Sequence, residues 1–449
     1  MRGAAPAVLV SCLLAGSATA ARANGAFPDS QTVLTPADRA QQIILVTNFG
    51  LVISEDGGQL WQWSCEREAN AFGYLHQLGP APRHRLFTVA NEKLAYSDDG
   101  SCGWQTAGGA LATPLVIDYF PDPTDAERVL AVGYADGVYA VYPSSDGGAT
   151  FAAPLYQAAV GDGIGGVEIA RADPRIIYVA LTTVDSITPK LARSDDGGAT
   201  WTVRDLGPMV GAAIARIIAV DPQDPNVVLL RLIGTDGQAI GLTRDGGATM
   251  TKTLEIAGSF TAYVALPSGA RLVGAMVDSN TTPALFRSRD GANTFEMVPD
   301  PPRIRALSQR GGVTYAATDN FGDGYALGAS SDEGTTWRAV MSYEQIQAII
   351  PCLRSDAQCQ TSCQALAGQG TTSPGMIWEP NVCSADPLVT PPKTDGGCGC
   401  AMGRERSGSV DVLVNVLVLV LVDVLVIGFR ARARARQRAR LRGSGARGG

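Results

Sequence analysis

The sequence predicts an all-β fold, a seven-bladed β-propeller built of four-stranded antiparallel blades. Three observations support this prediction. An eight-residue motif recurs seven times, successive copies lie 42–50 residues apart, and short apolar runs rather than long helical patterns flank each copy. Repeats of this length, each with four short strands, are typical of propeller blades. The 52 glycines and 26 prolines agree with many turns between short strands.

The motif begins with serine or threonine, has aspartate at its third position, and ends in an aromatic residue in six of the seven copies; SDDGGATW at 194–201 is one of them. The third-position aspartates are Asp56, Asp99, Asp146, Asp196, Asp245, Asp290 and Asp332. We expect a turn between the third and fourth strands of each blade. The aspartate should accept hydrogen bonds from N–H groups two residues on, and glycine should supply positive φ. The final aromatic residue should begin the outer strand and bury its ring between blades.

Each copy of the motif follows two β-branched runs, as in RIIYVAL and PKLARS, and an earlier apolar stretch that ends at Asp-Pro, as in IAVDP. Proline is excluded from the centre of a strand, so Asp-Pro indicates a turn. Seven such units in a ring leave few exposed sheet edges. Because the motif occurs once per blade, whereas a catalytic residue would be expected once per protein, we interpret it as structural.

The pattern S-x-D-x-G-x-T-W resembles the Asp-box (BNR) repeat of sialidases, of the sortilin luminal domain and of photosystem II assembly factor propellers. The seven matches cover residues 27–343. The resemblance implies that the motif is a structural turn remote from the binding face. Sialidases have six blades and an opening Phe/Tyr-Arg-Ile-Pro motif, which this sequence lacks. Tandem Asp-box propellers occur in xyloglucan-cleaving enzymes, whereas this sequence encodes one ring. No catalytic residue is assigned.

The two ends of the chain differ from the propeller, which we place at 24–343. Residues 1–23 have the pattern of a signal peptide, with Ala21 and Ala23 before the cleavage site. Residues 410–429 are long and apolar enough to span a membrane, and the arginine-rich tail at 430–449 should lie on the cytoplasmic side. Residues 1–429 contain 28 basic and 43 acidic residues, a net charge of −15. This acidic body argues against nucleic-acid binding.

Eight of the nine cysteines lie beyond the signal peptide. Cys65 and Cys102 are the two in the propeller, and an exported chain favours a bridge between them. Residues 344–383 form a Cys-rich cap with Cys352, Cys359, Cys363 and Cys383. Helical spacing disfavours a 359–363 bridge. Two pairings remain open, 352–359 with 363–383 or 352–363 with 359–383. A zinc site is the alternative. The cysteines lack the C-x₂-C spacing of such sites, so we assign no metal and no cofactor.

A Pro/Gly linker at 384–400 ends in Cys398 and Cys400, followed by the apolar span and the arginines. This order resembles the MYXO-CTERM sorting signal of myxobacterial surface proteins. The resemblance implies that Cys398 or Cys400 is a processing or attachment site. It also implies display at the cell surface or outer membrane, with release possible after processing.

A candidate binding face lies opposite the motif turns. In blades four, six and seven the connections between the second and third strands are long, at 182–190, 277–283 and 318–324, and the connection at 65–85 shares their face. The candidate ligand-contacting residues are Phe72, Tyr74, His76, Asp185, Asp278, Asp319 and Asp323.

The sequence therefore predicts an exported, monomeric, non-catalytic propeller that binds an extracellular glycan or protein. A glycoside hydrolase is the first alternative, because sialidases and xyloglucan-cleaving enzymes share the motif; an arginine cluster with paired carboxylates at the channel mouth would favour it. A structural or assembly role is the second.

Overall fold

The computed structural model describes residues 28–65 and 74–350. The chain divides into two compact units, 1–389 and 390–449. The predicted signal peptide, most of the cap, the linker, the apolar span and the arginine tail lie outside the described residues, as do Phe72 and the side chains of Cys65 and Tyr74.

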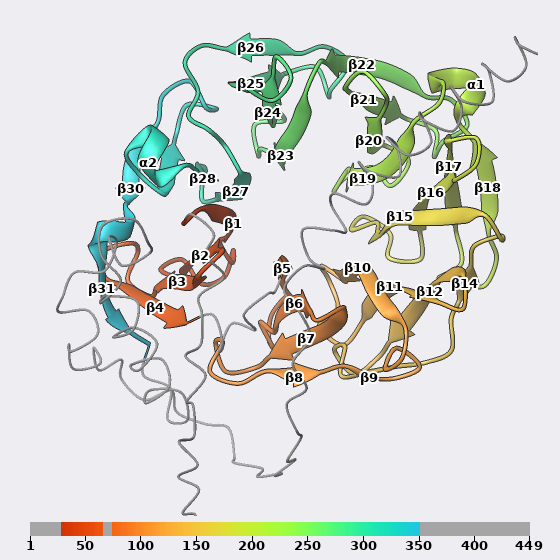
Figure 1. Ribbon diagram of the computed structural model, residues 1–449, viewed down its shortest axis with the longest axis horizontal. Helices are drawn as coiled ribbons and strands as arrows, with labels where there is room; N and C mark the ends of the chain where they lie inside the picture. Colours follow the sequence, from red (N-terminus) through yellow and green to blue (C-terminus); the bar gives the residue numbers. More distant parts are fainter. Residues whose placement is uncertain (1–27, 66–73, 351–449) are drawn as a thin grey trace, which may run out of the picture. The chain divides into compact units, whose positions relative to one another are not determined.

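Seven antiparallel sheets follow one another around a common centre, which confirms the seven-bladed propeller (Figure 1). Blade 1 contains β1 (Ser30–Leu34), β2 (Ile43–Thr47), β3 (Gly50–Ser54) and β4 (Trp61–Cys65). Blade 2 contains β5 (Tyr74–Leu78), β6 (Leu86–Ala90), β7 (Lys93–Ser97) and β8 (Gln105–Thr106). Blade 3 contains β10 (Leu115–Pro121), β11 (Val129–Ala135), β12 (Val138–Ser144) and β14 (Tyr156–Gln157).

The remaining blades repeat this order from the innermost to the outermost strand. Blade 4 contains β15 (Asp162–Ile169), β16 (Ile177–Thr183), β17 (Thr188–Ser194) and β18 (Thr202–Asp205). Blade 5 contains β19 (Ile214–Val220), β20 (Val228–Ile233), β21 (Gln238–Thr243) and β22 (Thr251–Ile256). Blade 6 contains β23 (Ser259–Ala265), β24 (Arg271–Val277), β25 (Thr282–Ser288) and β26 (Glu296–Val298). Blade 7 contains β27 (Ala306–Arg310), β28 (Val313–Ala317), β29 (Leu327–Ser330) and β30 (Arg338–Met341).

Short elements occupy the connections. They are β9 (Gly108–Gly109), which pairs with β13 (Thr150–Phe151), the helices α1 (Gly207–Val210) and α2 (Asn320–Asp323), the 3₁₀ turn η1 (Tyr343–Gln345) and the strand β31 (Ile346–Ile349). No helix among the described residues is both long and apolar enough for a membrane span.

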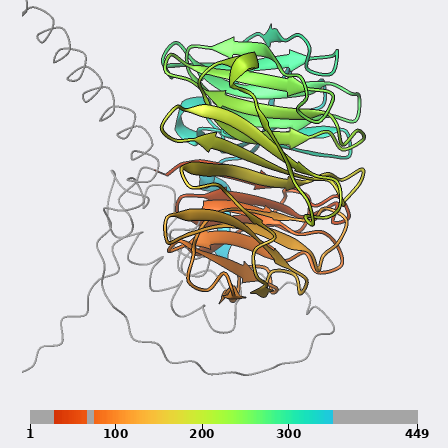
Figure 2. The same cartoon turned by 90° about the vertical axis from the view of Figure 1, so that its right-hand side faces the viewer.

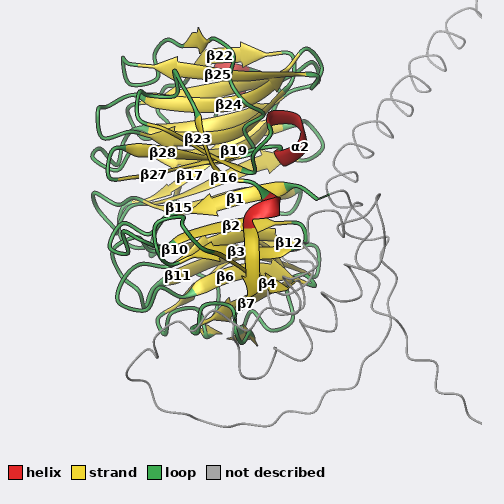
Figure 3. Cartoon of the chain, turned by 90° about the vertical axis from the view of Figure 1, so that its left-hand side faces the viewer, coloured by secondary structure: helices red, strands yellow, loops and turns green. Residues whose placement is uncertain are grey.

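The hydrophobic core is divided among the seven junctions between blades. Strand β2 shows the reason: Ile43 and Leu45 pack toward blade 7, whereas Ile44 and Val46 pack toward blade 2. In β20, Val228 and Leu230 face blade 4 and Leu229 faces blade 6. Successive side chains of a strand point to opposite faces, so a central strand with both faces buried is apolar at every position. This packing explains continuous runs such as VVLL, and the side views show the sheets lying face to face (Figures 2 and 3).

The seven motif copies all form turns between the third and fourth strands, as the sequence predicts. In blade 4, the Asp196 carboxylate accepts hydrogen bonds from the Ser194 hydroxyl (2.8 Å), the Thr200 N–H (2.8 Å) and the Thr200 hydroxyl (2.6 Å). The N–H groups that donate to the seven aspartates lie three or four residues further along the chain, not two as predicted. The N–H two residues on, such as that of Gly198, donates instead to the serine or threonine hydroxyl that begins the motif. The bonds from Thr200 and Ser194 hold the pKa of Asp196 at about 2.

Arginines join these turns across junctions. An arginine of blades 2, 5 and 6 donates to a backbone oxygen in the turn of the next blade: Arg85 to Gly147, Arg244 to Gly291, and Arg287 to Glu333. The sequence analysis did not identify these contacts. These hydrogen bonds link each turn to the preceding blade, because each guanidinium replaces water at a backbone carbonyl that has no partner within the turn.

The ring closes with a strand that the sequence analysis assigned to the cap. All four antiparallel strands of blade 1 come from the N-terminal region, and β31 then adds a fifth strand parallel to β4. The Ile350 N–H donates to the Trp63 oxygen (2.9 Å), and the Tyr343 and Ser30 hydroxyls are 2.8 Å apart. The propeller therefore extends past residue 343. The segment IQAI carries no copy of the motif, so the repeat pattern could not reveal it.

Cys102 is disulfide-bonded. The residues that precede the two propeller cysteines, Ser64 and Ser101, are hydrogen-bonded through their hydroxyls (2.9 Å). This contact agrees with a 65–102 bridge between blades 1 and 2, which stays a prediction because the side chain of Cys65 is not described.

We predict that the motif turns contribute measurably to stability. Asp146→Ala removes the bonds from Ser144 and Thr150, which are 2.6–2.9 Å long, and should lower the free energy of unfolding by about 1–2 kcal/mol. Asp146→Asn keeps one acceptor oxygen and should cost less. Chemical denaturation measures both, with Asp185→Ala in an exposed turn as the control. Equal stability of Asp146→Ala and the wild type would contradict a structural role.

Candidate functional site

The predicted binding residues do not form one cluster. Asp185 and Asp278 lie in exposed turns of blades 4 and 6, which are shorter than predicted because the flanking strands extend through Thr183 and Val277 and resume at Thr188 and Thr282. His76 is buried in β5, with its ring 6.4 Å from that of Trp104, rather than on a loop. Among the candidate residues whose side chains are described, Asp319 and Asp323 come together, at the two ends of one helical turn in the long connection of blade 7.

Asp319 shapes this connection as the N-cap of α2. Its carboxylate accepts hydrogen bonds from the Phe321 and Gly322 N–H groups (3.1 and 3.0 Å). Gly324 ends the turn in the left-handed conformation, with φ of 79°. An Asp-x-x-x-x-Gly segment thus folds as a capped single turn, because the side chain satisfies the first N–H groups and glycine allows the reversal.

Asp323 connects α2 to the segment that enters blade 7. Its Oδ2 accepts hydrogen bonds from the Arg303 N–H (2.9 Å) and the Asp319 N–H (3.2 Å). Burial raises the pKa of Asp323, and these two bonds partly offset the increase. The carboxylate therefore holds the two walls of a groove in place.

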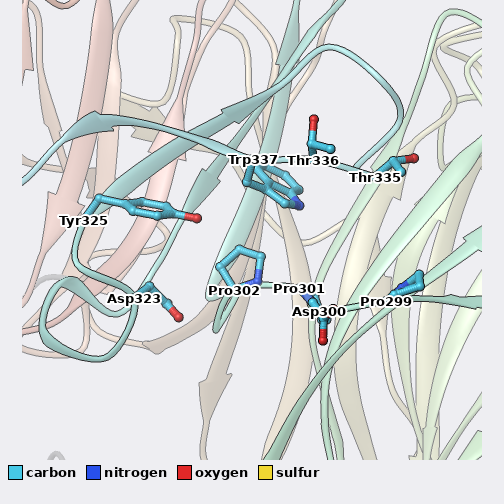
Figure 4. A pocket seen from close by; sticks show the side chains of 9 residues that line it. All are labelled: Pro299, Asp300, Pro301, Pro302, Asp323, Tyr325, Thr335, Thr336 and Trp337. Carbon is cyan, nitrogen blue, oxygen red and sulfur yellow. The ribbon is translucent and has the colours of Figure 1, made fainter.

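This groove, the rim groove, lies between blades 6 and 7 and has a volume of about 410 Å³ (Figure 4). Its lining residues are Pro299, Asp300, Pro301, Pro302, Asp323, Tyr325, Thr335, Thr336 and Trp337. The Tyr325 hydroxyl points toward Trp337 in Figure 4. The Trp337 indole N–H donates to the Gly334 oxygen (3.0 Å), which fixes the ring and leaves its face for other contacts. Tyr325 lies so close to Gly328 that a Cβ there would be 2.6 Å from its ring.

The packing beside Trp337 differs from that beside the equivalent tryptophans of blades 4 and 1. Trp201 occupies the position of Trp337 in blade 4 and makes the same indole bond, to Gly198 (3.0 Å). Its ring, however, stacks on Tyr156 of blade 3 at 4.7 Å. In blade 1, Trp61 is only 1% exposed because β31 pairs alongside it. At Trp337 the preceding blade supplies the segment Pro299–Pro302 instead of an aromatic ring, so the indole becomes the wall of an open groove.

A pair of carboxylates occupies a second region, on the inner strands of blades 3 and 4. Asp118 accepts a hydrogen bond from the Val167 N–H of the next blade (3.1 Å), and Glu168 accepts one from the Val220 N–H of the blade after that (2.8 Å). Burial raises the pKa of Asp118 to about 6 and that of Glu168 to about 8, and the charge of Asp118 adds to the second shift. The sequence analysis missed both residues, because they stand in ordinary strand sequences.

Glycines allow this close contact between inner strands. A Cβ at Gly165 would lie 2.2 Å from the Ala215 oxygen, and one at Gly166 would lie 3.1 Å from the Asp118 carboxylate. The run GIGG in β15 thus brings the backbones of adjacent blades together. Among the described residues, no group of three or more His, Cys, Asp or Glu side chains has the arrangement of a metal site.

No family model matches the chain. Among curated proteins, it is similar to a xyloglucanase from Paenibacillus sp., with 27% identity over 212 residues. The aligned region is 46% of this chain and 20% of the xyloglucanase, so the chain spans about a fifth of that relative's length.

Several solved structures have a similar fold. They include a puromycin-hydrolyzing peptidase from Mycobacterium tuberculosis (TM-score 0.50, 12% identity, 72% of this chain and 54% of that chain). The Niastella koreensis GH74 enzyme (TM-score 0.40, 16% identity) covers 69% of this chain, which spans 65% of that enzyme. YCF48 from Cyanidioschyzon merolae (TM-score 0.45, 11% identity) covers 67% of this chain, which spans 94% of YCF48. At these identities the likeness is one of fold alone.

We predict that Glu168 makes the stability of the propeller depend on pH. Because its pKa is raised to about 8, the folded chain keeps a proton that the unfolded chain has released above pH 4.5. Stability is therefore lost as pH rises toward 8. Between pH 6 and 8.5 the wild type should lose about 2–3 kcal/mol that Glu168→Gln retains. Denaturation at several pH values tests this, with the exposed Glu255→Gln as control; equal slopes for Glu168→Gln and the wild type would refute it.

We predict that Trp201 and Trp337 contribute differently to stability. Trp201→Ala removes a ring packed against Tyr156 and should cost about 2–4 kcal/mol. Trp337→Ala removes the same indole–carbonyl bond but a ring with one side open to the rim groove, so it should cost about half as much. Chemical denaturation of the two variants provides the comparison. A loss for Trp337→Ala as large as that for Trp201→Ala would mean that no open groove exists.

Proposed function

We propose that this propeller is an exported, non-catalytic binding protein that holds an extracellular polysaccharide in the rim groove. The observation that carries the proposal is the pair of rings, Tyr325 and Trp337, that line the rim groove together with the segment Pro299–Pro302. Export and surface display are proposed from the sequence alone, because the segments that predict them lie outside the described residues.

The lining of the rim groove suits a sugar polymer. Ligand sites combine apolar and aromatic walls with a few fixed polar groups. Here Trp337 and Tyr325 offer flat apolar surfaces for the C–H faces of pyranose rings, while the Tyr325 hydroxyl and the Asp323 carboxylate can bond to sugar hydroxyls. The site is preorganised, since the indole bond to Gly334 and the two bonds to Asp323 hold its walls. The similarity to a xyloglucanase supports a polysaccharide as the ligand class.

Glycoside hydrolysis is the second candidate, and Asp118 and Glu168 favour it. A carboxyl group with a pKa near 8 can act as a general acid, and a neighbouring carboxylate can act as base or nucleophile. It ranks second because both groups accept backbone N–H bonds across blade junctions, and neither lines the rim groove. These bonds give both residues a structural role that needs no substrate.

The test is a binding screen of the full-length protein against immobilised polysaccharides, followed by titration calorimetry and an assay for released sugar. We expect saturable binding without sugar release. Trp337→Ala should weaken binding by 10-fold or more, because a stacking surface is lost, while Asp278→Ala in the exposed turn of blade 6 should leave it unchanged. Unchanged affinity in a folded Trp337→Ala variant would remove the rim groove from consideration. Sugar release that Glu168→Gln abolishes would instead establish the hydrolase.

A further inference from the structure

The charged side chains that line the rim groove are both acidic. Asp300 is an exposed residue of the segment Pro299–Pro302, and Asp323 lies at the end of α2; in Figure 4 they stand on either side of Pro302. No lysine or arginine is among the nine lining residues. The aromatic surface is therefore bordered by negative charge.

Three arginines lie close to residues that line or border the rim groove, and two of them, Arg287 and Arg305, are in ion pairs. The Arg287 guanidinium pairs with Glu296 (2.8 Å) and donates to the Thr335 hydroxyl (2.9 Å) from the turn side. Arg305 pairs with Asp29 (3.2 Å). The guanidinium of Arg303 lies against Gly322 on α2, where a Cβ would be 2.2 Å from its Nη1. It lowers the pKa of Asp323 by its charge, but this is one of the smaller contributions.

We propose that the rim groove selects uncharged polysaccharides and rejects polyanionic ones, with Asp300 and Asp323 as the residues that determine this specificity. The inference rests on the proposed function of the groove and adds the chemical class of its ligand. A neutral sugar presents hydroxyl donors to these carboxylates, and the carboxylates accept them. A uronate or sulfate group in the same place would meet two like charges, which repel it most strongly at low salt. Specificity of this kind comes from repulsion of the wrong ligand.

The two carboxylates differ in what else they do. Asp323 holds the Arg303 and Asp319 N–H groups, so its replacement risks the shape of the groove. Asp300 is exposed at the rim, and Asp300→Asn changes its charge with little change of shape. Asp323→Asn keeps an oxygen that can accept the same two bonds. The two Asp→Asn substitutions therefore remove the charges while keeping the shape of the side chains. Equal melting temperatures of variant and wild type would show that the fold is kept.

The experiment compares matched polymers that differ in charge alone. Xyloglucan and galactomannan are each tested as the native neutral polymer and after oxidation of their primary hydroxyls to carboxylates, together with polygalacturonate and a deca-proline peptide. We expect the full-length wild type to bind a neutral polymer and to bind its oxidised form at least 10-fold more weakly at low salt. The difference should shrink as salt is raised, since the charges are partly exposed.

The double variant Asp300→Asn/Asp323→Asn should recover binding of the oxidised polymer and leave affinity for the neutral polymer within about threefold. Wild-type protein that binds oxidised and neutral forms equally would overturn the selectivity and leave polysaccharide binding intact. Recovery that fails in a correctly folded double variant would remove these two residues as its cause. Binding of the peptide alone, or of no polymer, would overturn the proposed function and this inference with it.

Discussion

The structure depends on apolar packing between the faces of adjacent sheets. Each blade places alternate residues of its central strands into two different cores, as β2 and β20 show, so no blade can bury its side chains without a neighbour on both sides. Stability of this kind requires a complete ring, because a missing blade would expose two apolar faces at once. The added strand β31 and the contacts of Tyr343 with blade 1 supply the last of these junctions.

Polar contacts then fix how adjacent blades are aligned, which apolar packing alone does not determine. Near the ring's centre, Asp118 and Glu168 reach the backbone of the following blade, and the glycines of β15 allow the strands to approach. On the side of the motif turns, arginines such as Arg85 and Arg244 bond to the next blade's turn. The rim groove is lined in part by the motif turn of blade 7, where Thr335 accepts a hydrogen bond from Arg287 and Thr336 donates to Asp332. Its other lining residues lie in connections outside the motif, and connections are where a scaffold of repeats can differ from blade to blade.

The repeat predicted the fold because each copy of the motif carries its own physical reason, a side-chain-capped turn that must be followed by an outer strand. Three features escaped that reasoning. The closing strand at Ile346–Ile349 has no motif, because it belongs to no repeat. The buried carboxylates Asp118 and Glu168 stand out only once the neighbouring blade is in place. The rim groove as a whole was not predicted: Asp323 was singled out from the long connection of blade 7, but the motif was expected to lie away from the binding face and to bury its final aromatic residue, here Trp337. Its exposure depends on what blade 6 places opposite it, and that relation spans about 40 residues.

The parallel pairing of β31 with β4 has a mechanical consequence. The predicted anchor lies C-terminal to β31, so tension on a tethered protein would enter the ring at this strand. Because Ile346, Ala348 and Ile349 are paired along the length of β4, a pull along the strand axis loads these contacts together in shear, whereas a sideways pull would open them one at a time. The strand that completes the ring thus also takes up the applied force, and its orientation decides how much force the propeller withstands before it opens.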